Sequence, residues 1–301
     1  MILEFATLVI FAVIFALGLI TGGLSNATSG GAGVVTIFVL TAYGNLIFKS
    51  ADATVLASST IFVFFGAISF YRKRQVHTQL AITVGLSGVV GAYLGATWAL
   101  RANSAALERA FGLFTLALAF YTSYMFYSDW KKKQTKKTSI VPQITGGSDG
   151  PVSPPIGTGE NAKALSTRFS GKDPASLAVQ IAKGVLIGIV TGIFGVSLAS
   201  LSVVLFIILF RLDMKLVLGT SLFASFLRYA GGTIAFLNTG QINIPYFLLL
   251  TIGGIVGSVV GARMILSDRT GSKEIYVKLI IILMLLFISY EFLLKFYLPQ
   301  V

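Results

Sequence analysis

Apolar runs of about 18 to 25 residues, the length that a helix needs to cross a bilayer, recur along nearly the whole chain. Short polar or basic stretches separate them. Strands of a membrane β-barrel would be shorter and would alternate apolar with polar residues. The pattern therefore predicts an all-α polytopic membrane protein. We expect ten apolar segments, at 3–24, 32–48, 51–71, 78–101, 105–128, 178–195, 197–211, 215–237, 246–267 and 275–297.

These segments fall into two similar halves of about five each. Three sequence matches occur in the same order at nearly one offset: 17–22 with 187–192, 66–76 with 232–242, and 88–96 with 254–262. Five crossings, or three crossings plus a hairpin that returns to its own side, are both odd numbers. The duplication therefore predicts two inverted-topology repeats, each opened by a short pair of broken or re-entrant helices.

Loop charges support the inversion. The loop Arg72-Lys73-Arg74 is basic, whereas the matching loop 238–241 carries no charge. Under the positive-inside rule the first loop lies in the cytoplasm and the second lies outside. The same rule places both termini outside a cell membrane.

The chain divides into a first membrane repeat at 1–130, a linker at 131–176 and a second membrane repeat at 177–301. The linker begins Lys131-Lys132-Lys133 and is rich in Pro, Gly and Ser. We expect it to be cytoplasmic, basic and flexible. The lysines fit a solvated tether, and contact with anionic lipid headgroups is the alternative.

Composition narrows the chemistry. The mean hydropathy is +0.86, and only 11% of residues are charged, as befits a membrane protein. The net charge of +12 comes from basic residues beside apolar runs, so we expect no nucleic-acid partner. There is no cysteine and one histidine, His77, so we expect no metal site and no cofactor.

The stretch TGGLSNATSGGAG, residues 21–33, separates the first two segments with small and polar residues. Transporters use such interruptions at the membrane midplane, where backbone amides and helix N-termini can bind anions. We therefore predict substrate contacts from this junction and from the corresponding junction of the second half: Asn26, Thr28, Ser29, Gly30, Gly31, Ser197 and Ser200. The alternative is that small residues only allow close helix packing, which is the role expected of Gly91, Gly95, Gly257 and Gly261.

Arg228 is the most informative single residue, because it lies just past the middle of an apolar segment. A charge there is costly unless it faces protein or water, and a guanidinium suits carboxylate, phosphate or sulfonate. We predict that Arg228 binds substrate; an Arg satisfied by carbonyls of a broken helix is the alternative. Ser59, Thr220 and Ser221 occupy matching places early in the third segments and either line the site or bond to their own helices. Arg263 is expected to extend toward the membrane surface.

Acidic residues suggest how transport is driven. Glu4, Glu108, Asp129 and Glu291 all fall near segment ends. Proton-coupled carriers commonly use buried acids. We therefore expect exchange, facilitated flux or coupling through protonation of the substrate itself.

The chain resembles the TauE/SafE family of sulfite and organosulfonate exporters. The resemblance rests on the Gly-rich junction opening each half, on Ala57-Ser58-Ser59 and Gly219-Thr220-Ser221, and on the Gly-x-x-Gly-x-x-x-Gly-Ala stretches at 88–96 and 254–262. It covers nearly all of the chain except the linker. It implies export of a small sulfur anion such as sulfite, sulfoacetate or another sulfonate.

Residues and resemblance together predict a transporter that moves a small anion by alternating access around Arg228. An anion channel, or an importer of a carboxylate, sulfate or thiosulfate, is the alternative. An enzyme is not expected, because no intramembrane base accompanies the serines; a lipid-phosphate enzyme is the weakest reading. The partners are a small anionic substrate and membrane lipid, and both a monomer and a homodimer fit the pattern.

Overall fold

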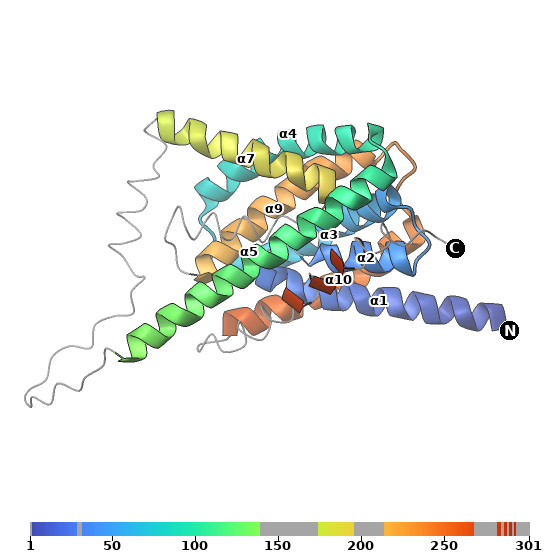
Figure 1. The fold of residues 1–301 in the computed structure, drawn as a ribbon, viewed down its shortest axis with the longest axis horizontal. Coiled ribbons are helices and arrows are strands. Elements are labelled where there is room, and N and C mark those ends of the chain that lie inside the picture. The colour runs from blue at the N-terminus through green and yellow to red at the C-terminus, as the bar shows by residue number, and fades with distance from the viewer. Residues whose placement is uncertain are drawn as a thin grey trace, which may run out of the picture.

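The computed structural model describes residues 2–28, 32–138, 174–195 and 214–267, with a few single positions between 282 and 292. These residues form helices joined by short loops (Figure 1). The helices are α1 (Ile2–Thr28), α2 (Gly33–Ala42), α3 (Phe48–Arg72), α4 (Thr78–Arg101), α5 (Ser104–Thr138), α7 (Pro174–Phe194), α9 (Met214–Phe236) and α10 (Ile244–Ser267). The expected segment 197–211 lies outside the described residues, as does most of 275–297.

Five of these helices are long and apolar enough to cross a membrane: α1, α3, α4, α7 and α10. The prediction of an all-helical, multi-pass membrane protein is therefore confirmed. Helix α4 has the predicted bounds. Helix α5 continues through the lysine run to Thr138, so the first part of the predicted linker is helical.

The Gly-rich junction between the first two helices is shorter than expected, because most of it belongs to α1. Helix α1 is a continuous helix of 27 residues that includes Thr21 to Thr28, and α2, with 10 residues, begins at Gly33. Thr21 and Ser25 donate their hydroxyl hydrogens to carbonyls one turn earlier, at 2.8 and 2.7 Å, which lets them remain in an apolar helix. The opening helix is thus full length, and only its partner α2 is short.

Two helix pairs approach each other through glycines. Helix α1 lies along α10, where a side chain on Gly22 would meet the backbone of Gly254. Helix α4 lies along α7, where a side chain on Gly91 would meet the backbone of Val185 and Ile189, and one on Gly95 would meet that of Ile189. Close approach of this kind stabilises membrane helices by dispersion contacts. The packing role expected of Gly91, Gly95, Gly257 and Gly261 is confirmed.

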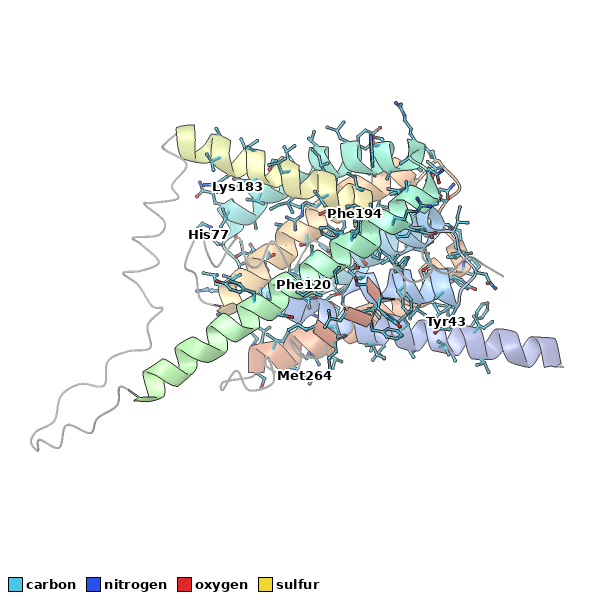
Figure 2. All side chains as sticks on the ribbon, viewed as in Figure 1. Tyr43, His77, Phe120, Lys183, Phe194 and Met264 are labelled. Atoms are coloured by element: carbon cyan, nitrogen blue, oxygen red, sulfur yellow. The ribbon has the colours of Figure 1, made fainter. Side chains whose placement is uncertain are left out.

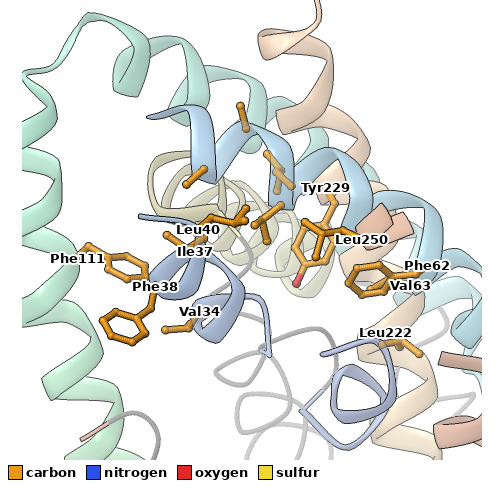
Figure 3. Packing of buried hydrophobic residues seen from close by; sticks show 14 of the residues in the cluster. Val34, Ile37, Phe38, Leu40, Phe62, Val63, Phe111, Leu222, Tyr229 and Leu250 are labelled. Carbon is orange, nitrogen blue, oxygen red and sulfur yellow. The ribbon is translucent and has the colours of Figure 1, made fainter. Parts of the chain in front are cut away.

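Helices α3 and α9 form the centre of the bundle, with α4 and α7 on one side and α1 and α10 on the other (Figure 1). They run antiparallel, because Leu56 meets Gly232 while Leu222 meets Gly66. Buried apolar side chains from α2, α3, α9 and α10 form one cluster at the centre of the bundle (Figure 3). This centre is where polar groups are protected from lipid and can serve a function.

Candidate functional site

Arg228 lies in this centre with no exposed surface. Its Nη2 donates a hydrogen bond to Oγ of Ser225, one turn earlier on α9, at 2.8 Å. The Ser225 side chain also shares a hydrogen bond with Tyr229, which is equally buried and is shown between Leu40 and Leu250 in Figure 3. Ser225 therefore orients the guanidinium. Neither Ser225 nor Tyr229 was predicted from the sequence. Their spacing of three and four residues was the available signal.

The aliphatic part of Arg228 lies against Gly88 of α4. A Cβ added to Gly88 would be 2.5 Å from Cγ of Arg228 and 3.2 Å from the carbonyl oxygen of Gly184 on α7. Arg228 therefore occupies the junction of α4, α7 and α9, and its stem needs the missing side chain at position 88. The charge therefore faces protein, and substrate binding by Arg228 stays a prediction.

Serine hydroxyls follow the same region of α3 and α9. Ser59 of α3 and Ser221 of α9 are fully buried, and neither Oγ has a hydrogen-bond partner among the described residues. The antiparallel register puts Ser59 level with Arg228 and Tyr229. Ser221 shares a helix face with Ser225 and Arg228, but it lies two turns, roughly 10 Å, from Arg228. The structure thus brings Ser59 to the height of the arginine and places Ser221 further along the same face.

The side-chain amide of Asn26 forms hydrogen bonds through its nitrogen but, within the described residues, not through its oxygen. Its Nδ2 donates to the carbonyl oxygens of Ser258, at 2.8 Å, and Gly22, at 3.1 Å, which fastens α1 to α10. Its Oδ1 is buried without a partner and lies where a side chain on Gly66 would be. The amide is therefore a structural tie whose oxygen can still accept a hydrogen bond.

Two predicted site residues have local partners. Thr28 donates its hydroxyl hydrogen to Leu24 of its own helix, at 3.1 Å. Thr220 donates to Leu216, at 2.6 Å, and accepts from the backbone N–H of His77, at 2.9 Å. Thr220 thereby holds the loop between α3 and α4 against α9. Both hydroxyls serve the fold in this conformation.

The remaining predicted site residues lie outside the described residues: Ser29, Gly30, Gly31, Ser197 and Ser200. Arg263 of α10 is exposed, and its expected extension toward the membrane surface stays a prediction.

Asp52 is a buried acid that the sequence analysis overlooked. It lies in the second turn of α3 and is 2% exposed. Its Oδ1 has no hydrogen-bond partner among the described residues and lies against Gly195, directly after α7. The apolar run was expected to begin at 51, which made Asp52 a terminal residue, whereas α3 begins at Phe48.

Buried polar atoms without partners are uncommon in folded proteins, because each loses its hydrogen bonds to water. The described part of this chain holds several besides those of Ser59, Ser221 and Asn26. They are Oγ1 of Thr36 on α2, Oδ1 of Asp52 on α3 and Oγ1 of Thr251 on α10. Together they leave hydrogen-bonding capacity around α3 that a polar ligand or water can use. Within the described residues, no group of three or more His, Asp or Glu side chains could hold a metal ion.

Comparison with known proteins gives a consistent result. Residues 14–292 match the family described as "Sulfite exporter TauE/SafE". The chain is 21% identical over 288 residues to the "Probable membrane transporter protein YunE" of Bacillus subtilis (strain 168), covering 93% of this chain and 98% of that protein. It is 24% identical over 256 residues to the "Probable membrane transporter protein YdhB" of the same organism, covering 85% and 89% respectively. No solved structure matches.

Proposed function

Since the chain belongs to the TauE/SafE family of membrane transporters, we propose that it exports a small sulfur oxyanion or sulfonate, bound by Arg228 near the centre of the bundle. The observation that carries the proposal is the complete burial of Arg228 at the junction of three helices. A guanidinium is always charged, and its planar fork of donors matches the oxygens of a sulfite or sulfonate group.

The surroundings of Arg228 suit an anion. Ser59 lies level with it and can donate its hydroxyl hydrogen without breaking a hydrogen bond within the described structure. Helix α2 begins with Ala32 as its N-cap, and the side chain of Ala32 makes no capping hydrogen bond to the first backbone N–H groups. Those donors, with Gly30, Gly31 and Ser29 before them, would favour negative charge. Ser197 and Ser200 would contribute from the matching junction.

We further propose that the two halves are inverted-topology repeats. Three relations support this. Helix α1 runs parallel to α10, and α7 runs parallel to α4, so the first helix of each half lies along the fourth helix of the other. The third helices, α3 and α9, run antiparallel. A two-fold axis in the membrane plane would relate the two halves in this way, because it pairs the first helix of each half with the fourth helix of the other and makes the third helices antiparallel.

The glycine contacts also align the halves residue by residue. Gly88 meets Arg228, and Gly254 meets Phe62. Both pairs follow an offset of 166, so in this alignment Arg228 would correspond to Phe62, and Ser59 would correspond to Ser225 rather than to Ser221, its expected match. The site is then asymmetric in charge: the second half supplies the cation, and the first half supplies an apolar ring in the same place.

Alternating access would follow from rocking of the two halves about the α3–α9 contact. The basic loop after α3 and the uncharged loop after α9 lie at opposite ends of this pair, because His77 bonds to the start of α9 and Gln241 bonds to the start of α3. The positive-inside rule then orients the molecule with Arg72, Lys73 and Arg74 in the cytoplasm.

Ligand binding tests the proposal directly. Detergent-purified protein would be heated with sulfite, sulfate, thiosulfate, sulfoacetate, taurine and matched carboxylates. A ligand at about a hundred times its Kd stabilises the folded state by about 2.7 kcal/mol, which raises the unfolding temperature measurably. We expect a rise with at least one sulfur anion that is absent in Arg228→Ala and present in Arg263→Ala. Equal rises in wild type and Arg228→Ala would contradict it.

A further inference from the structure

Asp52 has an environment that its ionised form does not suit. The side chain is 2% exposed, and its Oδ1 accepts no hydrogen bond within the described part of the chain. An isolated carboxylate out of water is very costly, so it requires a proton, a cation or a hydrogen-bonded partner. The described contacts of Asp52 therefore do not stabilise a carboxylate.

The group that lies against Asp52 is the end of α7. Gly195 follows the last residue of that helix with φ of +65°, the left-handed conformation that commonly terminates helices. The final carbonyls of a helix lack intrahelical partners and carry partial negative charge. A carboxylate beside them is repelled, whereas a neutral carboxyl group can donate its hydrogen to one of them.

The position is also internal. Phe194 at the end of α7 lies midway along the bundle in Figure 2, rather than at its edge. Around Asp52 itself, Ser50 donates to Gln241 at 2.6 Å, and Thr54 accepts from the backbone N–H of Asn243 at 3.0 Å. The uncharged α9–α10 loop is thus fastened to the start of α3, on the face that carries Ser50 and Thr54.

Few ionisable groups face this position. Helix α2 carries no charged residue, and the only charged residue of α7 is Lys183, roughly 18 Å before Gly195 along the helix. On α3, Lys49 donates its Nζ hydrogen to the carbonyl of Leu100 at 2.9 Å. On the helices packed against α3, the other ionisable groups whose side chains the structure describes are Glu108, Arg109 and Tyr124 of α5, Arg228 and Tyr229 of α9, and Tyr246 and Arg263 of α10.

We propose that Asp52 is a proton-binding site that couples anion export to the proton gradient. The carboxylate takes up one proton from water to form an O–H bond and then donates that hydrogen to a carbonyl at the end of α7. When the end of α7 separates from α3 and water enters, the proton leaves and the carboxylate is regenerated. This inference rests on the proposed transport function. It replaces the earlier expectation that coupling involves no buried acid.

The test uses Asp52→Asn, which keeps the shape of the neutral acid but cannot exchange a proton. The full chain would be reconstituted in vesicles with thiosulfate or methanesulfonate, which stay ionised at the pH values used. Wild type should exchange the anion at equal pH and should also accumulate it under an imposed pH gradient. Asp52→Asn should keep exchange and lose gradient-driven accumulation, whereas Glu108→Gln, a change at a partly exposed acid, should keep both. Accumulation by Asp52→Asn, or wild-type flux that needs Na⁺ and ignores the pH gradient, would overturn the proposal.

A second readout needs no substrate. The infrared carbonyl band of a neutral carboxylic acid should be present at neutral pH in wild type and Glu108→Gln and absent in Asp52→Asn. Its absence from wild type would overturn the Asp52 proposal whatever anion is carried. Its presence, with no flux of any sulfur anion, would count against the proposed substrate and leave Asp52 as the proton site.

Discussion

The aliphatic stem of Arg228 lies on Gly88, so that any side chain at position 88 would enter the space that the arginine occupies. On the other side of the bundle, the ring of Phe62 lies against Gly254 in a similar way. One pair carries a charge and the other carries only apolar surface. A change at the charged pair should therefore affect anion binding, whereas a change at the apolar pair should affect packing only.

Gly88→Ala should displace Arg228 and impair anion binding. The added methyl group would meet Cγ of Arg228 and the carbonyl of Gly184, so the guanidinium must move from its hydrogen bond with Ser225. Since a hydrogen bond to a charged group contributes about 1.5–3 kcal/mol, we expect anion affinity to fall by about one to two orders of magnitude. Titration of the thermal shift with the best anion measures this.

Gly254→Ala is the matched control, since its methyl group would meet the ring of Phe62 instead. It should lower the unfolding temperature and leave anion affinity within a few-fold of wild type. Equal losses of affinity in both variants would show that position 88 acts through packing alone.

Gly195→Ala should destabilise the protein for two separate reasons. A left-handed backbone conformation costs a residue with a Cβ about 1–2 kcal/mol, and here the Cβ would also collide with the carboxyl group of Asp52. Removing the carboxyl in Asp52→Ala should relieve the collision but not the backbone strain. The double variant should therefore be more stable than the sum of the single changes indicates, as judged by unfolding temperature. Strict additivity would contradict the contact.

Asn26→Leu should weaken the contact between α1 and α10. The change removes the hydrogen bond that the amide donates to the carbonyl of Ser258, for a loss of about 0.5–1.5 kcal/mol. Thermal unfolding in detergent measures it. Thr28→Val, which removes a hydroxyl bonded only within α1, should have a smaller effect on stability and should retain transport. Loss of anion binding in Thr28→Val would restore Thr28 to the site.

Inversion of the two halves predicts that matching loops face opposite sides of the membrane. The chain has no cysteine, so Lys73→Cys and Thr239→Cys each introduce a single thiol at an exposed position. A membrane-impermeant thiol reagent applied to intact cells should label Thr239→Cys alone, and permeabilised cells should show both. Labelling of both variants in intact cells would contradict the inverted arrangement.

Hydropathy predicted the long helices well because their ends coincide with changes in polarity. Helix α4 begins after His77, whose Nδ1 accepts from the backbone of Leu80, and ends at Arg101, as expected. Helix α5 passes its expected end because lysines are good helix formers, and hydropathy does not register a polar helix. Pattern alone therefore locates membrane crossings better than it locates helix ends.

The site was only partly predictable. The burial of Arg228 follows from the cost of a charge in an apolar segment, and this was evident from sequence. Asp52 was not, since its burial depends on the end of α7, where Gly195 lies against its carboxyl group. The sequence also did not reveal that the hydroxyl of Thr220, a predicted site residue, accepts a hydrogen bond from the backbone of His77. Tertiary contacts decide which of several similar polar residues stays available.

Anion flux through Arg228 tests the central claim most directly. Wild-type protein, Arg228→Ala and Arg263→Ala would be reconstituted in vesicles loaded with labelled sulfite. The efflux of sulfite would be compared with that from loaded vesicles that contain no protein. We expect saturable efflux from wild type and Arg263→Ala that a competing sulfonate inhibits. Efflux from Arg228→Ala should be no faster than the leak from vesicles that contain no protein. Efflux from Arg228→Ala at the wild-type rate would show that the buried arginine does not bind the transported anion.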